Sequence, residues 1–290
     1  MILVTGATGT TGSEVVKQLS AKGARVRAFV RDLKKGAALE GPAVELVQGD
    51  MSQPATLDAA LRGVERVFLV SPAHLRQMEW QGNVIEASKR AGVRHIVKLA
   101  AMEASLDSPA LFTRMHAQTE QQLEASGIAY THLHPTLFMQ SFLSYIPTIK
   151  SEGAIYAPFK DGRVGMVDAR DVASVAVAAL TEDGHYGQTC DITGPEALSF
   201  GDAAGILSEV LGKPVRYVDV PPAAARKSML EAGIEEWLVN DLLLLMAWFS
   251  SGQAAVVTST IASAAKIRPH TFRDFVRDYA SLFGERLDIY

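Results

Sequence analysis

The sequence predicts an α/β fold in which a doubly wound parallel sheet is followed by a smaller C-terminal lobe. The chain opens on a buried strand, a glycine-rich turn and a helix within residues 1–21. Six short apolar runs follow one another up to residue 133, and amphipathic helices separate most of them. After residue 135 the alternation becomes irregular. We therefore divide the chain into a first domain, 1–135, and a smaller lobe, 136–290, parts of which return to the sheet.

The opening segment is the one around which the other elements are arranged. Residues 2–4 are typical of a buried strand, and residues 13–21 carry apolar side chains on one helical face. Three glycines and three threonines stand between them: Gly6, Thr8, Gly9, Thr10, Thr11 and Gly12. Such a turn lets a pyrophosphate approach the backbone at the positive end of a helix, so we predict a Rossmann-type coenzyme site. The spacing departs from the standard G-x-G-x-x-G, and a tight turn without a ligand is the alternative.

The other elements follow from hydrophobic periodicity. In the first half we expect strands at 24–30, 44–47, 67–70, 95–100 and 128–133, and helices at 57–61, 78–91 and 109–126. In the second half we expect strands at 189–193 and 215–218, and helices at 172–180, 203–211, 223–232, 235–249 and 270–283. Capping-box patterns begin at Asp168 and Ser199.

The end of the second strand indicates which coenzyme is bound. Arg31 stands about 20 residues past the glycines, where such domains meet the adenosine ribose. A guanidinium there suits the 2′-phosphate of NADP, whereas an NAD enzyme usually has a carboxylate. We therefore predict NADP(H), with NAD as the second choice because Asp32 follows directly. The alternative is that Arg31 and Asp32 form a solvated turn.

Two further strand ends are expected to contact the coenzyme, because the carboxyl ends of parallel strands line the ligand crevice. Asp50 can accept a hydrogen bond from the adenine amino group, and Met51 can lie against the ring. A turn or helix cap is the alternative for Asp50. Ser71 and Pro72 are expected near the ribose or the pyrophosphate.

Composition excludes several classes of function. The net charge of −4 argues against broad nucleic-acid binding. The longest apolar run, 242–249, is far too short to span a membrane. Cys190 is the only cysteine, which suits a reducing cytoplasm and excludes a cysteine-based zinc site. His132 and His134 share one face of a strand without a third ligand at a metal spacing, so we expect no metal.

Several motifs together resemble the NmrA-like branch of the atypical short-chain dehydrogenases/reductases. They lie at residues 4–12, 29–32, 48–50, 91–95, 133–139 and 168–173, and the similarity extends over nearly the whole chain. Within that branch the chain is most similar to NAD(P)H quinone reductases and triphenylmethane-dye reductases. The resemblance implies an NADP(H)-binding Rossmann domain with the nicotinamide near Pro135, Leu137 and Phe138. The family also includes isoflavone-reductase-like enzymes and a non-catalytic redox-sensing regulator.

The chain departs from typical short-chain dehydrogenases at the catalytic positions. The fifth strand ends in two alanines where those enzymes have a serine. Phe112 stands where the catalytic tyrosine would be, and His116 stands where the lysine would be. We expect His116 to bind the nicotinamide ribose or to donate a proton to the product, with a structural role as the alternative. Without the phenol, conjugated electron-poor acceptors are favoured over simple ketones, which develop a localised alkoxide.

Two apolar segments of the second lobe admit more than one role. Phe138, Met139, Phe142 and Tyr145 lie at helical spacing, either in the core or along an apolar substrate pocket. Trp237 and residues 242–249 could cap the pocket, fill the core or join two subunits as a homodimer.

The leading hypothesis is an NADPH-dependent oxidoreductase that transfers hydride to quinones, dyes or other small apolar, conjugated acceptors. A non-catalytic NADP-binding redox-sensing regulator is the first alternative. A reductase of a biosynthetic intermediate that uses His116 as its acid is the second.

Overall fold

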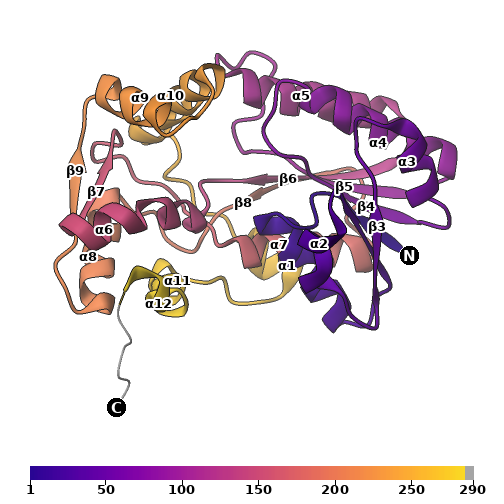
Figure 1. Cartoon of the computed structure of the whole chain (residues 1–290), viewed down its shortest axis with the longest axis horizontal. Helices are drawn as coiled ribbons and strands as arrows, with labels where there is room; N and C mark the ends of the chain where they lie inside the picture. Colours follow the sequence, from indigo (N-terminus) through magenta and orange to yellow (C-terminus); the bar gives the residue numbers. More distant parts are fainter. Residues whose placement is uncertain (285–290) are drawn as a thin grey trace.

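The computed structural model describes residues 1–284, so the end of the predicted second lobe, 285–290, lies outside the described residues. A seven-stranded, all-parallel sheet runs through the molecule in the order β3-β2-β1-β4-β5-β6-β8 (Figure 1). Its strands are β1 Ile2–Val4, β2 Val26–Val30, β3 Val44–Gln48, β4 Arg66–Leu69, β5 His95–Leu99, β6 Ala129–Pro135 and β8 Gln188–Ile192. The predicted Rossmann-type fold class is confirmed.

Helices cover both faces of this sheet. On one face lie α1 (Thr10–Ala21) and α7 (Ala169–Thr181), which contact each other closely (Figure 1). On the other face lie α3 (Pro54–Ala60), α4 (Gln77–Ala91) and α5 (Leu111–Ala125). The short α2 (Leu33–Gly36) and the 3-10 helix η1 (Ala37–Leu39) connect β2 to β3.

Strand β8 and helix α7 both come from the second half of the chain. Strand β8 extends the sheet at β6, in register from Thr131 opposite Gln188 to Pro135 opposite Ile192. Helix α7 is almost entirely buried because its Ala and Val side chains face both α1 and the sheet. The large sheet is therefore completed by residues that follow the predicted boundary at 135.

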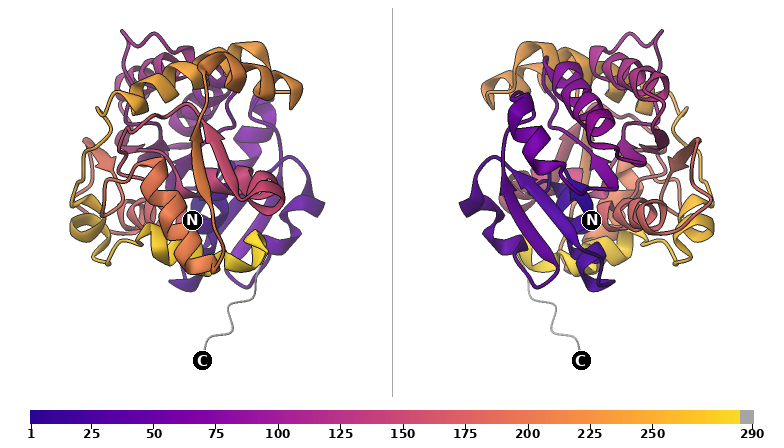
Figure 2. Two further views of the ribbon diagram at one scale, coloured as in Figure 1. Left: turned by 90° about the vertical axis from the view of Figure 1, so that its left-hand side faces the viewer. Right: turned by 90° about the vertical axis from the view of Figure 1, so that its right-hand side faces the viewer.

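The second lobe is built around its own small sheet and aromatic core. Strands β7 (Ala154–Ala157) and β9 (Arg216–Asp219) pair in parallel and lie side by side in Figure 2. The surrounding helices are η2 (Met139–Tyr145), α6 (Ile146–Glu152), α8 (Phe200–Leu211), α9 (Pro222–Glu231), α10 (Glu236–Ser250), α11 (Phe272–Asp278) and α12 (Ala280–Phe283). The π-helix η3 (Ile261–Ala265) packs on α7.

The apolar segment after the sixth strand belongs mainly to this core. It forms the 3-10 helix η2 rather than an α-helix, and Met139 and Phe142 are fully buried. Phe142 stacks on Phe200 at 4.9 Å between ring centroids and meets the Phe272 ring edge-on at 4.7 Å. Tyr145 is only partly buried at the border of the same cluster.

Two local predictions need correction. The first helix begins at Thr10 rather than residue 13, with Gly9 as its N-cap, so the last three residues of the glycine turn form its first turn. The capping box at Ser199 is present, but at Asp168 only half of the pattern is formed. Asp168 caps α7 by accepting from the Arg170 N–H at 2.8 Å, whereas Asp171 accepts from the backbone and ring of His270.

Candidate coenzyme and active site

The turn between β1 and α1 requires glycine at two positions. Gly6 has φ +55°, in the left-handed region that glycine favours. A Cβ on Gly12 would lie 2.2 Å from the Gly6 carbonyl oxygen, so any side chain there would disrupt the turn. The first helical hydrogen bond runs from Ser13 N to Gly9 O at 2.9 Å. The N–H groups of Thr10, Thr11 and Gly12 therefore point out of the helix end, as an anion requires.

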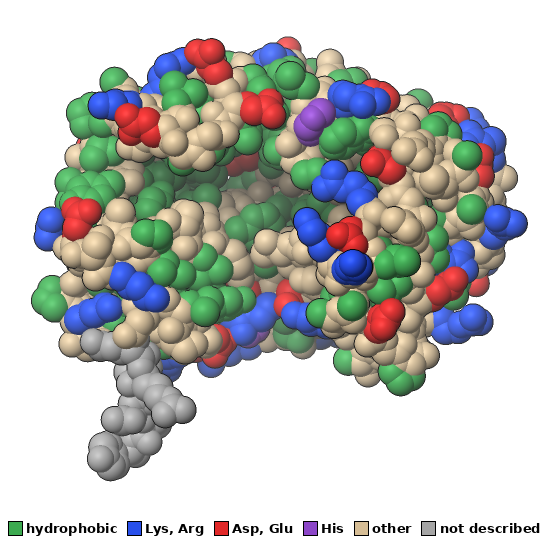
Figure 3. Space-filling view, in the orientation of Figure 1, with side chains coloured by type: hydrophobic (Ala, Val, Ile, Leu, Met, Phe, Trp, Pro, Cys, Tyr) green, Lys and Arg blue, Asp and Glu red, His purple; other side chains and the backbone are tan. Residues whose placement is uncertain are grey.

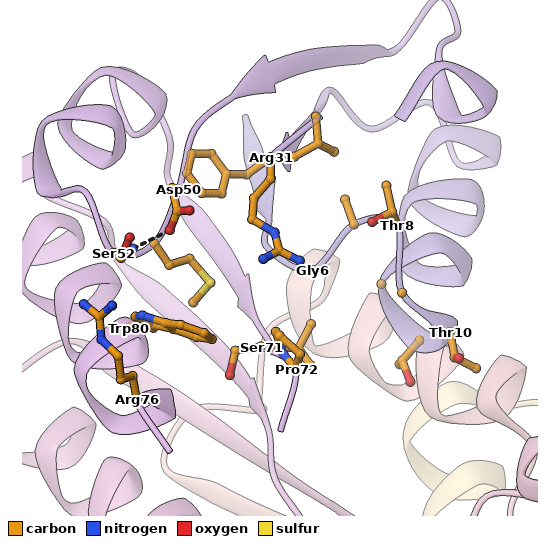
Figure 4. A pocket seen from close by; sticks show the side chains of 18 residues that line it. Gly6, Thr8, Thr10, Arg31, Asp50, Ser52, Ser71, Pro72, Arg76 and Trp80 are labelled. Carbon is orange, nitrogen blue, oxygen red and sulfur yellow. Dashed lines mark hydrogen bonds between the residues drawn. The ribbon is translucent and has the colours of Figure 1, made fainter. Parts of the chain in front are cut away.

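A cavity of about 540 Å³ opens over this turn (Figure 4). Eleven predicted coenzyme residues line it: Gly6, Thr8, Gly9, Thr10, Thr11, Gly12, Arg31, Asp50, Met51, Ser71 and Pro72. They come from the carboxyl ends of β1, β2, β3 and β4 and from the first turn of α1. A glycine-walled cradle at a helix N-terminus, flanked by a cation, fits a phosphate-rich dinucleotide.

Arg31 and the neighbouring Asp32 have different roles at the tip of β2. The Arg31 guanidinium points into the cavity toward the glycine turn (Figure 4). The Asp32 carboxylate instead accepts from the Lys34 N–H at 2.8 Å and caps α2. A second cavity of about 400 Å³ is lined by Thr8, Val30, Arg31, Asp32 and Lys35. The cations at this rim suit a 2′-phosphate, and the capping role occupies the carboxylate that would otherwise favour NAD.

Asp50 combines the two roles that the sequence left open. Its Oδ1 accepts from the Ser52 N–H at 2.8 Å, which closes a turn after β3. The same carboxylate faces the cavity beside Arg31 (Figure 4). Hydrogen bonds from Ser52 lower the pKa of Asp50, so the group is ionised at neutral pH and can accept from an amino group.

Two prominent lining residues of helix α4 and the segment before it were not predicted. Trp80 turns its ring into the cavity on the same side as Asp50 (Figure 4). The ring stacks on His74 at 4.3 Å between centroids. Arg76 lies 5.9 Å from the Trp80 centroid and forms a 2.6 Å ion pair with Glu79. The Trp80 ring and Met51 together make a flat apolar wall suited to a nucleobase such as adenine. The other unpredicted lining residues are Ala7, Phe29, Val30, Ser52 and Val70.

His116 lies outside this cavity, within a group of buried ionisable residues between β5, β6 and α5. It is 6% exposed, and its Nδ1 lies 3.1 Å from the Nζ of Lys98, which is 0% exposed. Glu120, one turn further along α5, accepts from His134 Nε2 at 2.9 Å and lies 3.7 Å from Lys98 Nζ. Burial and the neighbouring Lys98 charge hold the pKa of His116 well below its usual range, so its imidazole is neutral.

The predicted nicotinamide residues follow the same part of the sheet. Pro135 ends β6, and its carbonyl accepts from the Met102 N–H at 3.1 Å. Leu137 and Phe138 are partly buried and, like Pro135, do not line the 540 Å³ cavity. Burial raises the pKa of the nearby Glu103 to about 7, and its Oε1 is enclosed without a hydrogen-bond partner in the described chain. Glu103 was not predicted, because a single carboxylate in a loop carries no motif.

The space between the two lobes is hollowed and lined by apolar side chains on the face seen in Figure 3. A cavity of about 320 Å³ lies between the ends of β7 and β9 and helix α10, with Pro158, Pro221, Leu243 and Met246 among its walls. Helix α10 is held to the first domain by Asp241, whose two carboxylate oxygens accept from the Leu111 N–H at 3.0 Å and the Phe112 N–H at 2.6 Å. The helix that carries His116 is thereby connected to the second lobe.

Two negative findings concern residues 1–284. No three His, Cys, Asp or Glu side chains in this range are grouped to hold a metal ion. None of the helices in the described part combines the length and apolar character needed to cross a membrane.

Comparisons with known proteins identify the family and its relatives. The model of the NmrA-like family matches residues 1–276. An NAD(P)H azoreductase from Xenophilus azovorans is 39% identical over 284 residues, 98% of this chain and 99% of the relative. An NADPH-dependent quinone oxidoreductase from Escherichia coli, solved with NADPH, has a TM-score of 0.87 at 28% identity, covering 97% of this chain and 100% of that chain. A triphenylmethane reductase from Citrobacter sp. with NADP(H) has a TM-score of 0.85 at 28% identity, covering 96% and 99%.

Proposed function

The chain belongs to the NmrA-like family and is an NAD(P)H-dependent oxidoreductase, and we propose that it passes hydride from NADPH to small, conjugated, electron-poor acceptors such as quinones and azo or triphenylmethane dyes. The observation that carries the proposal is the cavity over the glycine turn, with Arg31 at its rim and no catalytic phenol at Phe112. The resemblance inferred from the sequence motifs is confirmed.

The coenzyme is NADP(H), which supplies the hydride when it is bound. We propose that the glycine turn and α1 hold the pyrophosphate, that Arg31 and Lys35 hold the 2′-phosphate, and that Trp80, Met51 and Asp50 receive the adenine. The reactive end would lie toward Pro135, Leu137 and Phe138, at the entrance to the apolar hollow between the lobes.

The protein supplies position and one polar donor to this reaction. A quinone or a cationic dye spreads or cancels the charge that arrives with hydride, so little proton donation is needed in the transition state. A simple ketone develops a localised alkoxide and would need the phenol that this chain lacks at Phe112. His116 is proposed to bind the nicotinamide ribose or to donate a proton to the product.

Steady-state NADPH oxidation with a panel of acceptors tests the proposal. We expect turnover with a quinone, an azo dye and a triphenylmethane dye, and far slower turnover with an aliphatic ketone of similar size. Faster turnover of the ketone would contradict the proposed acceptor class. Tight NADPH binding with every acceptor inert would favour the regulator instead.

The role of His116 is tested separately. In H116A we expect kcat to fall by about ten- to a hundredfold. This loss is at or below the low end of the roughly 10²–10⁴-fold rate factor that acid–base catalysis typically contributes, because the preferred acceptors need little proton donation. The unfolding temperature should change little. If His116 donates a proton, the affinity for NADPH should also change little, whereas a contact with the nicotinamide ribose predicts weaker NADPH binding. An unchanged kcat would remove the role. A loss confined to proton-demanding acceptors would favour a biosynthetic reductase that uses His116 as its acid.

The cellular setting is also a proposal. A dinucleotide-dependent enzyme with a single, buried cysteine suits the cytoplasm, with small molecules rather than nucleic acid as its ligands. Leu244 on α10 is 40% exposed, which is consistent with a homodimer through this helix. Size-exclusion chromatography with light scattering measures the subunit number, and a monomer at micromolar concentration would contradict a stable dimer.

A further inference from the structure

Lys98 is a buried cation without a role in the reaction proposed above. It lies on β5 with its side chain 0% exposed, and its Nζ reaches two acceptors, Nδ1 of His116 at 3.1 Å and Oε1 of Glu120 at 3.7 Å. An ammonium group has three donors and no acceptor. Lysine is rarely buried unless it is paired, so the position of this one calls for a specific function.

The contact with His116 has a defined direction. The imidazole is neutral, because burial and Lys98 keep its pKa well below the usual range. Burial lowers the pKa of Lys98 to about 8, against the opposing effect of Glu120, so the lysine is still mainly an ammonium at pH 7. Lys98 must therefore donate to Nδ1, and the single ring proton of His116 resides on Nε2.

The other ring nitrogen is the one that reaches solvent. Nε2 of His116 has no hydrogen-bond partner within residues 1–284, yet it is not among the enclosed, unpartnered nitrogens, which include Nδ1 of His95 and Nδ1 of His132. The Phe112 ring packs edge-on against the imidazole at 4.5 Å and limits its rotation. The Nε2–H bond is thus oriented outward by contacts on two sides.

We propose that Lys98 is a positioning residue that fixes His116 as the Nε2–H tautomer and so makes His116 a hydrogen-bond donor to the acceptor. The proposal rests on the proposed function of His116. Without Lys98, the ring would exchange between two tautomers, and one of them would present a lone pair to developing negative charge.

The contact between Lys98 and His116 also allows a proton to be delivered to a product that needs one. As the Nε2–H bond breaks and its proton moves to the anionic oxygen or nitrogen of the product, a proton of Lys98 Nζ moves to Nδ1. The imidazole stays neutral throughout, and Lys98 becomes a neutral amine. A proton taken from water at Nε2, with return of the Nδ1 proton to Nζ, restores the starting state.

Several charged groups surround this pair and set the pH range of the effect. Glu120 on α5 lies beside Lys98, and His132 and His134 on β6 lie beside Glu120. Glu124 on α5 and Asp191 on β8 contact these two histidines in turn, and Glu103 from the loop after β5 interacts with His134. Glu120 is the one carboxylate within 4 Å of Lys98 Nζ among the described residues. Any variant at Lys98 therefore needs a partner variant that removes the charge of Glu120.

The test compares K98M, the charge-balanced K98M/E120Q, and H95Q as a matched control. His95 is equally buried on the same strand. Because it lies three residues before Lys98, its side chain faces the opposite side of the sheet, where Nε2 lies 2.9 Å from Oγ1 of Thr131. Long-range ¹H–¹⁵N correlations of the histidine rings report the tautomer directly, and H116Q identifies the His116 signals. Turnover of a proton-demanding enone is measured from pH 6 to 10.

We expect wild type and H95Q to show His116 as Nε2–H, and K98M and K98M/E120Q to show a mixture. In wild type, kcat for the enone should fall above about pH 8, because Lys98 loses its proton there. In K98M/E120Q, kcat should no longer depend on pH in this range. It should also be lower than in wild type by about tenfold or more, with KM for NADPH unchanged. A wild-type His116 protonated on Nδ1, or a double variant that keeps the Nε2–H tautomer, would overturn the role of Lys98. If H116Q has full activity while the tautomer is as expected, only the proposed role of His116 fails.

Discussion

At the scale of single residues, Arg31 is the side chain that we propose to determine coenzyme choice. It points into the cavity while Asp32, its neighbour, is held as a helix cap by the Lys34 N–H. We expect R31Q to weaken NADPH binding by about ten- to a hundredfold, the value of one charge-assisted hydrogen bond, and to leave NADH binding nearly unchanged. Fluorescence titration with each coenzyme measures both dissociation constants.

The control for Arg31 is K34Q, which removes the same charge from a neighbouring residue that does not line either coenzyme cavity. This variant should bind both coenzymes as wild type does. If R31Q weakened NADPH and NADH equally, the guanidinium would be acting on the shared part of the two coenzymes and not on the 2′-phosphate.

Gly9 and Gly12 separate folding from coenzyme binding. A Cβ on Gly12 would lie 2.2 Å from the Gly6 carbonyl oxygen, so G12A should lower the free energy of unfolding by about 1–3 kcal/mol as well as coenzyme affinity. At Gly9 the closest atom is 3.2 Å away and φ is −83°, which alanine adopts. We expect G9A to fold nearly normally and to lose NADPH affinity, measured by chemical unfolding and by titration. Equal stability losses in both would contradict this separation.

At the scale of elements, the link between α10 and α5 should govern the acceptor site. Asp241 is 5% exposed, and it satisfies two N–H groups at the start of α5, which are otherwise without partners in a helix end. We expect D241A to cost about 1–3 kcal/mol of stability and to raise KM for the acceptor, with the Kd for NADPH unchanged. Thermal unfolding and steady-state kinetics measure these effects.

The matched control on the same helix is E236A. Glu236 is exposed and, within residues 1–284, pairs only with Arg226, so its loss should cost at most about 1 kcal/mol and leave KM unchanged. A D241A variant with altered NADPH affinity and an unaltered acceptor KM would show that α10 supports the coenzyme domain instead.

Elements with strong periodicity are predictable from the sequence, whereas their partners are not. Helices α4, α5 and α10 lie close to the predicted ranges because each has a continuous apolar face. Strand β7 was not predicted, since it has four residues and its partner β9 is far along the chain. In the site, the glycine turn and Arg31 follow from motif chemistry, but Trp80 lies in an ordinary amphipathic helix and Lys98 in an ordinary buried strand.

At the scale of the whole molecule, the chain places a group of ionisable residues inside the domain that binds the coenzyme. Lys98, His116, Glu120 and His134 lie between the sheet and α5, where charge is costly unless it is paired. Replacing the group by apolar side chains would be expected to stabilise the fold. Its presence is better explained by a role in proton transfer than by a contribution to stability. The free energy of unfolding should therefore depend on pH, and the dependence can be assigned to particular groups.

Glu103 provides the clearest case. Its pKa is raised from 4.5 in the ordinary state to about 7 in the folded protein, because its carboxyl is enclosed. Below pH 4.5 the group is protonated in both states and has no effect. As pH rises from about 4.5 to 7, only the unfolded chain ionises, so the wild-type protein loses stability through this range. At about 1.4 kcal/mol per pKa unit, the loss approaches roughly 3 kcal/mol above pH 7.

We therefore expect E103Q to be more stable than wild type at pH 8 by up to about 3 kcal/mol, and the difference to shrink toward zero near pH 4.5. Urea unfolding at several pH values measures it. E86Q on the exposed face of α4 is the control and should shift stability little at any pH. If E103Q were less stable at pH 8 and its deficit grew with pH, the Glu103 carboxyl would be ionised and paired in the folded protein.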